Sequence, residues 1–409
     1  MIEQAAPDSG DGSVGARSAA RCRHFGWCGG CARQDVGYEE QVRMKESELR
    51  AVLGEHAAVL KPVVPSPSPW FYRNKMEFAF GFERAEQEGA PPAVALGLRR
   101  KGRFYGVVNL QECFLMCEAV PRVLAAAREW ATEHGLPPYH LRRHQGLLRY
   151  VVMREGKRTR DLLVILVTAK PPDEGAFIAL LADLAARLRE IGVSSFLWSV
   201  TDRQADLAVG EIRRVLMGKP GFTEKLAGVT FDLSPYAFFQ PNVELAERLI
   251  ERSRVLLGEG WEMLVDLYSG VGGLSLALAG GAKRVIGIEL EAAAVADATR
   301  NAASNGLASR CRFVAEDALT FLRRFSDYSF LGDRWAVLLD PPRAGMHPKM
   351  AAQVLRVAPP VVLYVSCNAR KLAEDLGILK HAYRVDEITP YDFFPHTPHV
   401  EALAKLTRK

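Results

Sequence analysis

Apolar strands alternate with helical segments along the second half of the chain. From Pro241 onward, five short apolar runs each come directly before a helix or a loop. A crossover helix returns the chain to the same sheet in the parallel direction, so this rhythm predicts an α/β fold with a doubly wound, Rossmann-like parallel sheet. The five runs are MLVDLY, RVIGIEL, RCRFVAE, AVLLD and VVLYVS.

A different pattern covers the middle of the chain, from Phe71 to about Leu233. Alternating or β-branched stretches such as KMEFAFGF, FYGVVNL, YVVMRE, DLLVILVT and FLWSVTD are separated by charged or glycine-containing turns. These stretches predict a β-rich α+β region that includes helices near 119–134 and 174–191. Before it, residues 35–56 predict a heavily charged amphipathic helix.

These patterns divide the chain into four parts. The first part is polar and lacks periodic apolar positions, so it is expected to be a disordered tail. The second holds three cysteines and the charged helix, the third is the β-rich region, and the fourth is the α/β sheet. Their predicted bounds are 1–20, 21–60, 61–235 and 236–409.

Composition places the chain among globular proteins. It has 409 residues, of which 48% are hydrophobic and 25% charged, and this length suits two or three domains of about 100 to 200 residues each. The net charge of +5 is compatible with a nucleic-acid partner but does not establish one. No apolar run approaches the roughly 18 residues that span a bilayer, and the first twenty residues lack a signal-peptide core. We therefore expect a cytoplasmic monomer without membrane contact.

The seven cysteines suggest metal binding or catalysis. An odd number in a reducing compartment argues against a disulfide framework. Cys311 lies in an apolar strand and is expected to be a small buried hydrophobe. Three others follow the spacing Cys22-x5-Cys28-x2-Cys31. A zinc module remains an alternative for these three, although the x5 spacing suits a compact finger poorly.

A glycine-rich turn follows the first strand of the predicted α/β sheet. In the segment VDLYSGVGG, Gly270 and Gly273 permit a tight turn and close approach of the backbone to a ligand. A nicotinamide cofactor fits this turn almost as well, because Glu289 ends the second strand where a ribose-binding acid is expected. A glycine turn without any ligand is the third interpretation.

Two further acids distinguish the possible cofactors. Asp317 follows the third strand and Asp340 the fourth, so both are expected at the carboxyl edge of the sheet, where ligands bind. S-adenosylmethionine offers a ribose diol and an adenine amine to carboxylates and has no pyrophosphate for them to repel. The acids therefore favour S-adenosylmethionine. In LDPPRAG, the prolines stiffen the backbone that presents Asp340 and Arg343, although Asp340 could instead cap a helix.

The fifth strand ends in a thiol at the same edge. Cys367 begins a polar turn after VVLYVS, and it could act as a nucleophile if the cofactor sulfonium or Arg343 lowers its pKa. Glu401 begins the final strand and could act as a general base if burial raises its pKa. The alternative for Glu401 is an exposed strand residue. His396 and His399 lack further metal ligands, so we expect them to order their loop or contact substrate.

Taken together, the motifs FFQPN (238–242), DLYSGVGG, DPPRAG, VSCN and FFPHTPHVE resemble those of the RNA uracil-C5 methyltransferase family. The resemblance covers the catalytic half of the chain. It implies a class I, S-adenosylmethionine-dependent methyltransferase sheet. The three N-terminal cysteines resemble the 4Fe–4S site of this family, which implies Cys113 as the fourth ligand, with Cys117 as the alternative.

The resemblance also implies a mechanism. Carbon 5 of uracil is too weak a nucleophile to take a methyl group unaided, so the Cys367 thiolate attacks carbon 6 first, and Glu401 later removes the carbon-5 proton. At position 273, this chain has glycine where some relatives have asparagine. The residues implied in contacts with the cofactor or the target base are Gln240, Tyr268, Glu289, Asp317 and Asp340.

RNA is the partner that the resemblance implies. The cysteine cluster begins at Cys22, which leaves no room for the β-barrel RNA-binding domain that many relatives carry before it. We therefore expect RNA contacts from FYRNKMEF, RRKGRF and RRHQGLLRY in the β-rich region, where basic and aromatic residues interleave. The expected substrate is 23S rRNA, with tRNA as the alternative. A radical S-adenosylmethionine enzyme, expected to carry a C-x3-C-x2-C triad, and a non-catalytic RNA-binding protein are the competing classes.

Overall fold

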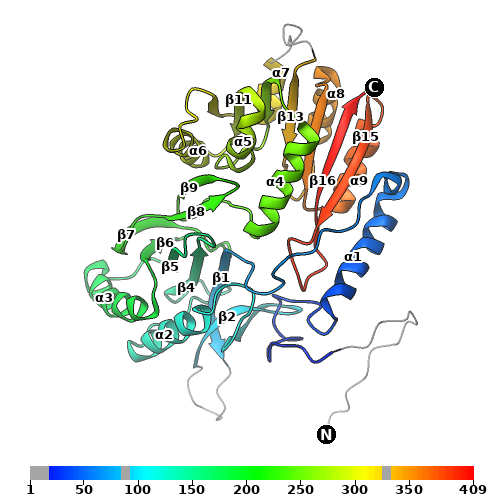
Figure 1. The fold of residues 1–409 in the computed structure, drawn as a ribbon. Helices are drawn as coiled ribbons and strands as arrows, with labels where there is room; N and C mark the ends of the chain where they lie inside the picture. The colour runs from blue at the N-terminus through cyan, green and yellow to red at the C-terminus, as the bar shows by residue number, and fades with distance from the viewer. Residues whose placement is uncertain (1–17, 84–92, 325–332) are drawn as a thin grey trace.

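In the part of the chain that the structure describes, the strands form two seven-stranded sheets and a small β-hairpin (Figure 1). The computed structural model describes residues 18–83, 93–324 and 333–409. Of the disordered tail predicted for 1–20, residues 1–17 lie outside the described part. No helix in the described part is both long and apolar enough to cross a bilayer.

The first sheet occupies the region predicted to be β-rich, with strand order β3-β2-β1-β4-β5-β6-β7. Helices α2 (Val120–Glu133) and α3 (Glu174–Ile191) form where the sequence predicts them and cover one face (Figure 1). The parallel pair β5–β6 is joined through α3. The strands are β1 (Lys75–Glu83), β2 (Ala93–Arg100), β3 (Arg103–Asn109), β4 (Leu148–Glu155), β5 (Leu162–Thr168), β6 (Ser195–Val200) and β7 (Glu211–Met217).

The second sheet has strand order β12-β11-β10-β13-β14-β16-β15. Its first five strands are parallel, as predicted, but β16 lies antiparallel between β14 and β15. The prediction of an all-parallel sheet is therefore wrong at this edge, because a loop rather than a crossover helix joins β15 to β16 and the chain turns back. The strands are β10 (Trp261–Asp266), β11 (Ala282–Glu289), β12 (Cys311–Ala315), β13 (Trp335–Leu339), β14 (Val361–Ser366), β15 (Tyr383–Tyr391) and β16 (Glu401–Arg408).

Helices cover both faces of this second sheet, which explains its continuous apolar runs. Successive residues of a strand point to opposite faces. Leu338 accordingly packs in the core beneath α4, α5 and α6, and Leu339 packs in the core beneath α7, α8 and α9. Cys311 is buried as predicted. The helices are α4 (Val243–Leu257), α5 (Gly273–Leu278), α6 (Ala292–Ser304), α7 (Ala318–Arg324), α8 (Pro348–Val357) and α9 (Ala369–Leu379).

The N-terminal part connects the two sheets. Helix α1 (Tyr38–Leu53), within the predicted range 35–56, packs beside α9 (Figure 1). A short 3-10 helix, η1 (Gly54–Val59), follows, and the chain then runs along the outer edge of β15, where Lys61 N donates to Ile388 O at 2.8 Å. Residues 21–36, here termed the cysteine segment, contact the first sheet, where Gly29 N donates to Arg99 O at 2.9 Å.

A hairpin of β8 (Phe222–Leu226) and β9 (Val229–Leu233) leads from the first sheet into the second. After the hairpin, the segment 234–242 passes the end of β4. The buried guanidinium of Arg154 donates to Ala237 O at 2.7 Å there and holds this segment against the first sheet. The hairpin region therefore presents the FFQPN motif between the two sheets.

Candidate active site

Chemically reactive side chains gather at the carboxyl edge of the second sheet. Asp266 ends β10, Glu289 ends β11, Asp340 directly follows β13, and Cys367 directly follows β14. These strands are parallel neighbours, so their carboxyl ends lie along one edge. The fold thus brings together residues from distant parts of the sequence, as the strand pattern predicts.

Strand register brings Glu401 to this edge as well. The antiparallel pairing of β14 with β16 runs from Val361↔Thr407 to Ser366↔Ala402. The next position of that register sets Cys367 opposite Glu401, and directly opposed residues of an antiparallel pair project from the same face. The alternative of an exposed strand residue does not hold, because Glu401 is only 3% exposed.

The surroundings of Cys367 favour the protonated thiol. Burial, followed by the carboxylates of Glu401 and Asp340, raises the pKa of Cys367 to about 11, although the Arg343 guanidinium acts to lower it. The sequence-based hypothesis required Arg343 or the cofactor sulfonium to lower the thiol pKa, and in the protein alone Arg343 lowers the pKa of Cys367 without meeting that condition. Two acids and burial together outweigh one arginine, whose side chain also donates to His399 Nδ1 at 3.1 Å.

Asp340 is held by a glutamine that precedes the second sheet. Gln240 Nε2 donates to Asp340 Oδ2 at 3.2 Å, and Asn74 Nδ2, directly before β1, donates to Gln240 O at 2.7 Å. Burial and the nearby Asp266 raise the pKa of Asp340 to about 7. Burial, followed by the charge of Asp340, raises the pKa of Glu401 well above its usual value. The predicted direction for Glu401 is therefore confirmed.

The glycine turn links the first two strands of this edge. Gly270 adopts φ +52°, a left-handed conformation that favours glycine, and its N–H donates to Glu289 Oε2 at 3.1 Å. Gly273 begins α5 with open space around its Cα. At Gly287 on β11, a Cβ would lie 2.4 Å from the Phe313 ring, so only glycine allows this close packing behind the turn.

Tyr268 and Asp317 were both predicted to contact the cofactor or the target base, and the charge of Asp317 acts on Tyr268. Burial raises the pKa of Tyr268 to about 12, and the charge of Asp317 also raises it. Asp317 is exposed and caps α7, where Oδ1 accepts from Thr320 N at 2.8 Å. Helix capping was the alternative considered for Asp340, and the structure instead assigns that contact to Asp317.

The sequence-based prediction missed Asp266, the acid within VDLY. Asp266 is buried, its Oδ2 accepts from Ser275 Oγ at 2.6 Å, and burial raises its pKa to about 6. An acid at the last position of an otherwise apolar strand is the signal that could have identified it. Three of the carboxyl groups at this edge, those of Asp266, Asp340 and Glu401, are therefore harder to ionise than in water.

Four cysteines of the N-terminal half line one small enclosed cavity. An apolar wall of the same cavity is formed by Phe25, Leu98, Leu110 and Leu115, and the polar Gln34 and Glu112 also line it. Burial raises the pKa of Cys113 to about 12, and the other three thiols add to that effect. Backbone N–H groups point to the sulfurs, as in Gly30 N to Cys28 Sγ at 3.4 Å. The four cysteines are Cys22, Cys28, Cys31 and Cys113.

Cys117 is not part of this group. Burial raises its pKa to about 11, but the charges that act on it come from Glu155 and Lys157. Within the described residues, no three His, Cys, Asp or Glu side chains converge closely enough to hold a single metal ion. A single zinc ion requires every sulfur at about 2.3 Å from one point, whereas the thiolates of an iron–sulfur cluster bind different irons. The donor set and the apolar wall fit such a cluster, whose presence stays a prediction.

A groove lies between the cysteine segment, the first sheet and residues 397–399 of the loop before Glu401. Its volume is about 670 Å³, and its walls include Arg73, Lys75, Arg99 and His399. Arg99 is paired with Asp206 at 2.7 Å. One predicted RNA contact is wrong, because Arg149 of RRHQGLLRY is buried and donates to backbone carbonyl groups of residues 201–205.

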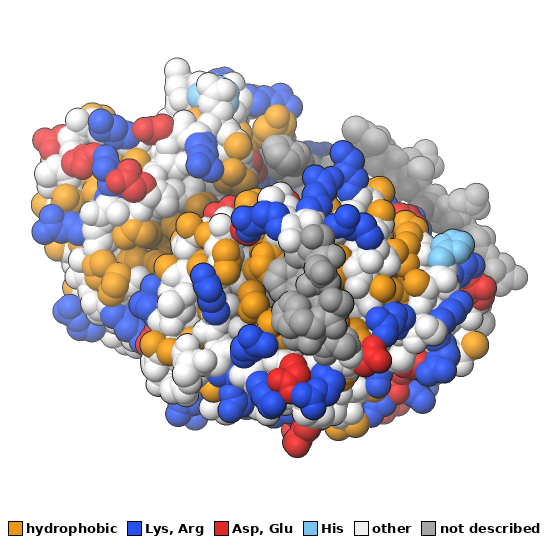
Figure 2. Space-filling view, turned by 90° about the horizontal axis from the view of Figure 1, so that it is seen from above, with side chains coloured by type: hydrophobic (Ala, Val, Ile, Leu, Met, Phe, Trp, Pro, Cys, Tyr) orange, Lys and Arg blue, Asp and Glu red, His pale blue; other side chains and the backbone are white. Residues whose placement is uncertain are grey.

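The opposite end of the second sheet looks different. Figure 2 shows that Lys and Arg side chains are spread over that end among hydrophobic ones, without a single continuous stripe. The groove combines basic side chains with His399, which contacts Arg343, and is therefore the better candidate surface for a nucleic-acid strand.

Comparisons with known proteins agree with this geometry. The family model described as tRNA (Uracil-5-)-methyltransferase matches residues 226–409. The tRNA (uracil(54)-C(5))-methyltransferase of Pyrococcus horikoshii is 34% identical and covers 95% of this chain and 86% of its own length. An uncharacterized RNA methyltransferase of Clostridium tetani is also 34% identical, with coverage of 95% and 84%.

A solved structure is similar over nearly the whole chain. It is the tRNA (uracil-54, C5)-methyltransferase of Pyrococcus abyssi in complex with S-adenosyl-L-homocysteine. It aligns with a TM-score of 0.73 and 31% identity, and it covers 93% of this chain and 86% of its own. The similarity therefore includes both sheets.

Proposed function

Because this chain belongs to the family of S-adenosylmethionine-dependent RNA uracil-5-methyltransferases, we propose that it methylates carbon 5 of a uridine in transfer RNA. Cys367 is the covalent nucleophile and Glu401 the general base. The observation that supports these roles best is the juxtaposition of the two side chains by the β14–β16 register, at the edge where Gln240 contacts Asp340.

The reaction follows from the chemistry of uracil. The thiolate of Cys367 adds to carbon 6, and the electron pair of the C5–C6 double bond makes carbon 5 a nucleophile. S-adenosylmethionine supplies the methyl group to that carbon. Glu401 then takes the proton from carbon 5, the double bond re-forms, and the thiolate leaves carbon 6. The raised pKa of Glu401 suits it to accept this proton.

The carboxyl edge is suited to a cationic ligand. Burial and mutual repulsion raise the pKa values of Asp266, Asp340 and Glu401, so a nearby positive charge favours their ionised forms. A sulfonium ion provides that charge, whereas a dinucleotide pyrophosphate would add repulsion. The residues proposed to contact the bound co-substrate are Gln240, Tyr268, Gly270, Gly273, Glu289, Asp317 and Asp340.

Transfer RNA is preferred as the substrate because of the named relatives. The sequence alone favoured 23S rRNA, but the archaeal relatives that align along nearly the whole chain are named tRNA (uracil(54)-C(5))-methyltransferases. The groove lined by Arg73 and Lys75 is the proposed path of the RNA strand toward Cys367, since cationic side chains there can contact phosphates.

We also propose that Cys22, Cys28, Cys31 and Cys113 hold a 4Fe–4S cluster. The enclosed cavity, the N–H groups directed at sulfur and the apolar wall support this assignment. When bound, such a cluster would join the cysteine segment to the loop that carries Cys113. Iron and acid-labile sulfide in anaerobically purified protein test the proposal, and zinc in their place would overturn it.

The substrate proposal is tested in RNA from a strain that lacks the gene. We expect 5-methyluridine to disappear from the tRNA fraction and to return when the wild-type gene, but not the C367A gene, is supplied. Loss of 5-methyluridine from 23S rRNA alone would overturn tRNA as the substrate and leave the chemistry intact. An unchanged 5-methyluridine content in both fractions would contradict the activity itself.

A further inference from the structure

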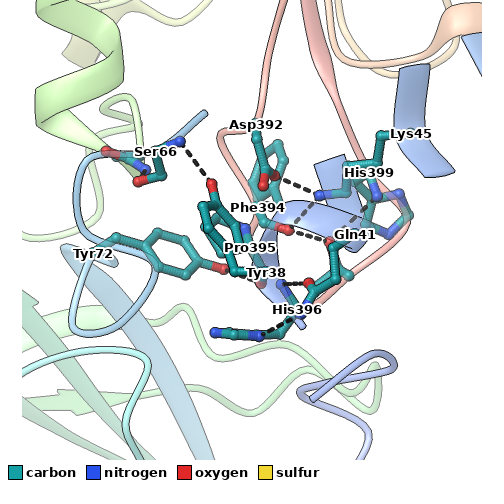
Figure 3. Close-up of polar contacts among 12 residues, drawn as sticks. Tyr38, Gln41, Lys45, Ser66, Tyr72, Asp392, Phe394, Pro395, His396 and His399 are labelled. Carbon is teal, nitrogen blue, oxygen red and sulfur yellow. Dashed lines mark hydrogen bonds and ion pairs between the residues drawn. The ribbon is translucent and has the colours of Figure 1, made fainter. Parts of the chain in front are cut away.

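Helix α1 carries two polar side chains that are almost completely buried, although no step of the reaction uses them. Gln41 and Lys45 are each 1% exposed. They lie four residues apart and therefore share one face of the helix with the apolar Leu49 and Leu53. Both point at residues 392–400, here termed the catalytic loop, which connects β15 to Glu401 at the start of β16 (Figure 3).

Gln41 holds His396 at the middle of this loop. Gln41 Oε1 accepts from His396 N at 2.9 Å, and Gln41 Nε2 lies 3.2 Å from His396 Nδ1 (Figure 3). Burial lowers the pKa of His396 to about 4, so the ring is neutral and Nδ1 can accept from the amide. His396 also adopts φ +65°, a strained conformation for this residue, and stacks on Trp70 at 3.8 Å. Such a conformation persists only when its surroundings hold it.

The cysteine segment and Lys45 secure the rest of the loop. Ala32 N and Arg33 N, directly after Cys31, donate to His396 O at 2.8 and 3.0 Å. Lys45 forms a fully buried ion pair with Asp392, and its ammonium group donates to Phe394 O at 3.0 Å. The N-terminal part thus contacts the loop at Asp392, Phe394 and His396, which are alternate residues.

Buried polar contacts of this kind fix one geometry better than apolar packing does, because each donor must meet its own acceptor. The pair Tyr391↔Glu401 is the last of the β15–β16 hairpin, so Glu401 lies where the hairpin would open first. The loop that closes this hairpin is the part that α1 holds. Cys367, in contrast, lies between β14 and α9 and does not depend on the loop for its backbone position.

We propose that Gln41 and Lys45 are positioning residues for proton abstraction, which act through the catalytic loop to keep Glu401 at carbon 5 of the target base. The inference rests on the proposed function. Addition of Cys367 and methyl transfer precede the step that uses Glu401. A loosened loop should therefore slow the last step and leave the first two nearly unchanged.

The test compares Q41L with R43Q, a control on the exposed side of the same helix where Arg43 pairs with Glu40. On uridine-containing tRNA, Q41L should lower kcat roughly tenfold or more with KM changed by about twofold at most. It should also accumulate a covalent protein–RNA species on denaturing gels. On 5-fluorouridine RNA, where no proton is present on carbon 5, Q41L should form its adduct at about the wild-type rate. R43Q should match the wild type in both assays.

A second variant guards against misfolding. The double variant K45M/D392N leaves no unpaired buried charge. Like Q41L, it should lower kcat on uridine RNA and leave the rate of adduct formation on 5-fluorouridine RNA nearly unchanged. If adduct formation and kcat fall together in both variants, or if no covalent species accumulates on uridine RNA, the positioning role is overturned in favour of a structural one. If the wild type forms no 5-fluorouridine adduct, the proposed function fails instead, and this inference fails with it.

Discussion

The thiol of Cys367 and the thiols of the N-terminal cavity are both buried enough to favour the protonated form, but their neighbours differ. Around Cys367, the neighbouring charges are the carboxylates of Glu401 and Asp340, opposed by one arginine. Around Cys113, the neighbours are other thiols and backbone N–H groups. Cys367 is half-buried, whereas Cys113 is 7% exposed.

This difference in neighbours suits Cys367 to act as a nucleophile and the four cavity cysteines to act as metal ligands. A lone thiol beside acids ionises when a cation arrives, and the acids remain to move a proton afterwards. Four thiols around one cavity, with Glu112 as the acid that lines it, can share several metal ions. Neither site supplies enough positive charge itself, so in both cases we expect the bound group to complete the site.

The largest expected effect comes from removal of the lone thiol. C367A should lower turnover by a factor on the order of 10⁴ or more, because no other residue can add to carbon 6. The same variant should form no adduct with 5-fluorouridine RNA on denaturing gels. C311A removes a buried thiol far from the edge and is the matched control, which should retain the adduct. An adduct that persists in C367A would show that another residue is the nucleophile.

Removal of the Glu401 carboxylate should lower turnover but raise the reactivity of the Cys367 thiol. E401Q should lower turnover by about 10² to 10⁴, the range for a lost general base. Since the charge of Glu401 raises the pKa of Cys367, the same variant should react faster with iodoacetamide at neutral pH. E374Q, an exposed change on α9, should alter neither rate. Slower alkylation of E401Q would contradict the proposed electrostatics.

The pH dependence of kcat/KM should follow from the raised pKa values of Cys367 and Asp340. The thiolate fraction of Cys367 rises tenfold per pH unit below its pKa of about 11, and Asp340 ionises around pH 7. In the free enzyme, kcat/KM should therefore increase from pH 6 to pH 9 by up to about tenfold per unit. Initial rates at low RNA concentration measure this profile. A maximum below pH 7 would contradict the assignment of a protonated resting thiol.

Substitution of a cysteine that lines the N-terminal cavity should have the smallest effect on turnover and a clear effect on iron content. C113A should lose most of its iron, whereas C117A should retain it, because only Cys113 lines the cavity with the other three cysteines. Cys113 is buried and Cys117 is partly buried, so each change should have a direct packing cost of about 1 to 2 kcal/mol. Iron analysis and thermal unfolding of the pair distinguish cluster loss from simple packing loss. Equal iron content in both variants would contradict the ligand assignment.

The pattern of apolar residues predicted most of the fold, because a strand that is buried on both faces has a continuous apolar sequence. The run WAVLL is apolar throughout because helices cover both sides of β13. The antiparallel edge was not predictable in this way, since β15 and β16 have the same composition in either direction. The position of β16 between β14 and β15 follows from the turn that the catalytic loop makes. That loop contacts α1, which belongs to the other half of the chain.

The candidate site was predictable in its members but not in its electrostatics. Motifs at strand ends identified Cys367, Asp340 and Glu401, because parallel strands end at one edge. The pKa of a thiol depends on how far each charge lies from it and how deeply it is buried, and spacing in sequence gives neither. Asp266 and Lys45 were overlooked for a related reason, because one lies within a motif and the other within a charged helix. Only the structure shows that each is buried.

The contact between Gln41 and His396 joins residues that are 355 positions apart in the chain. At a synthesis rate of about 5 to 20 residues per second, His396 is made roughly 20 to 70 seconds after Gln41. Glu401 is added later still, after Cys367. A chain still attached to the ribosome, itself rich in RNA, therefore has its nucleophile before it has a positioned base. It cannot complete a turnover until synthesis has passed Glu401 and the loop has closed on α1.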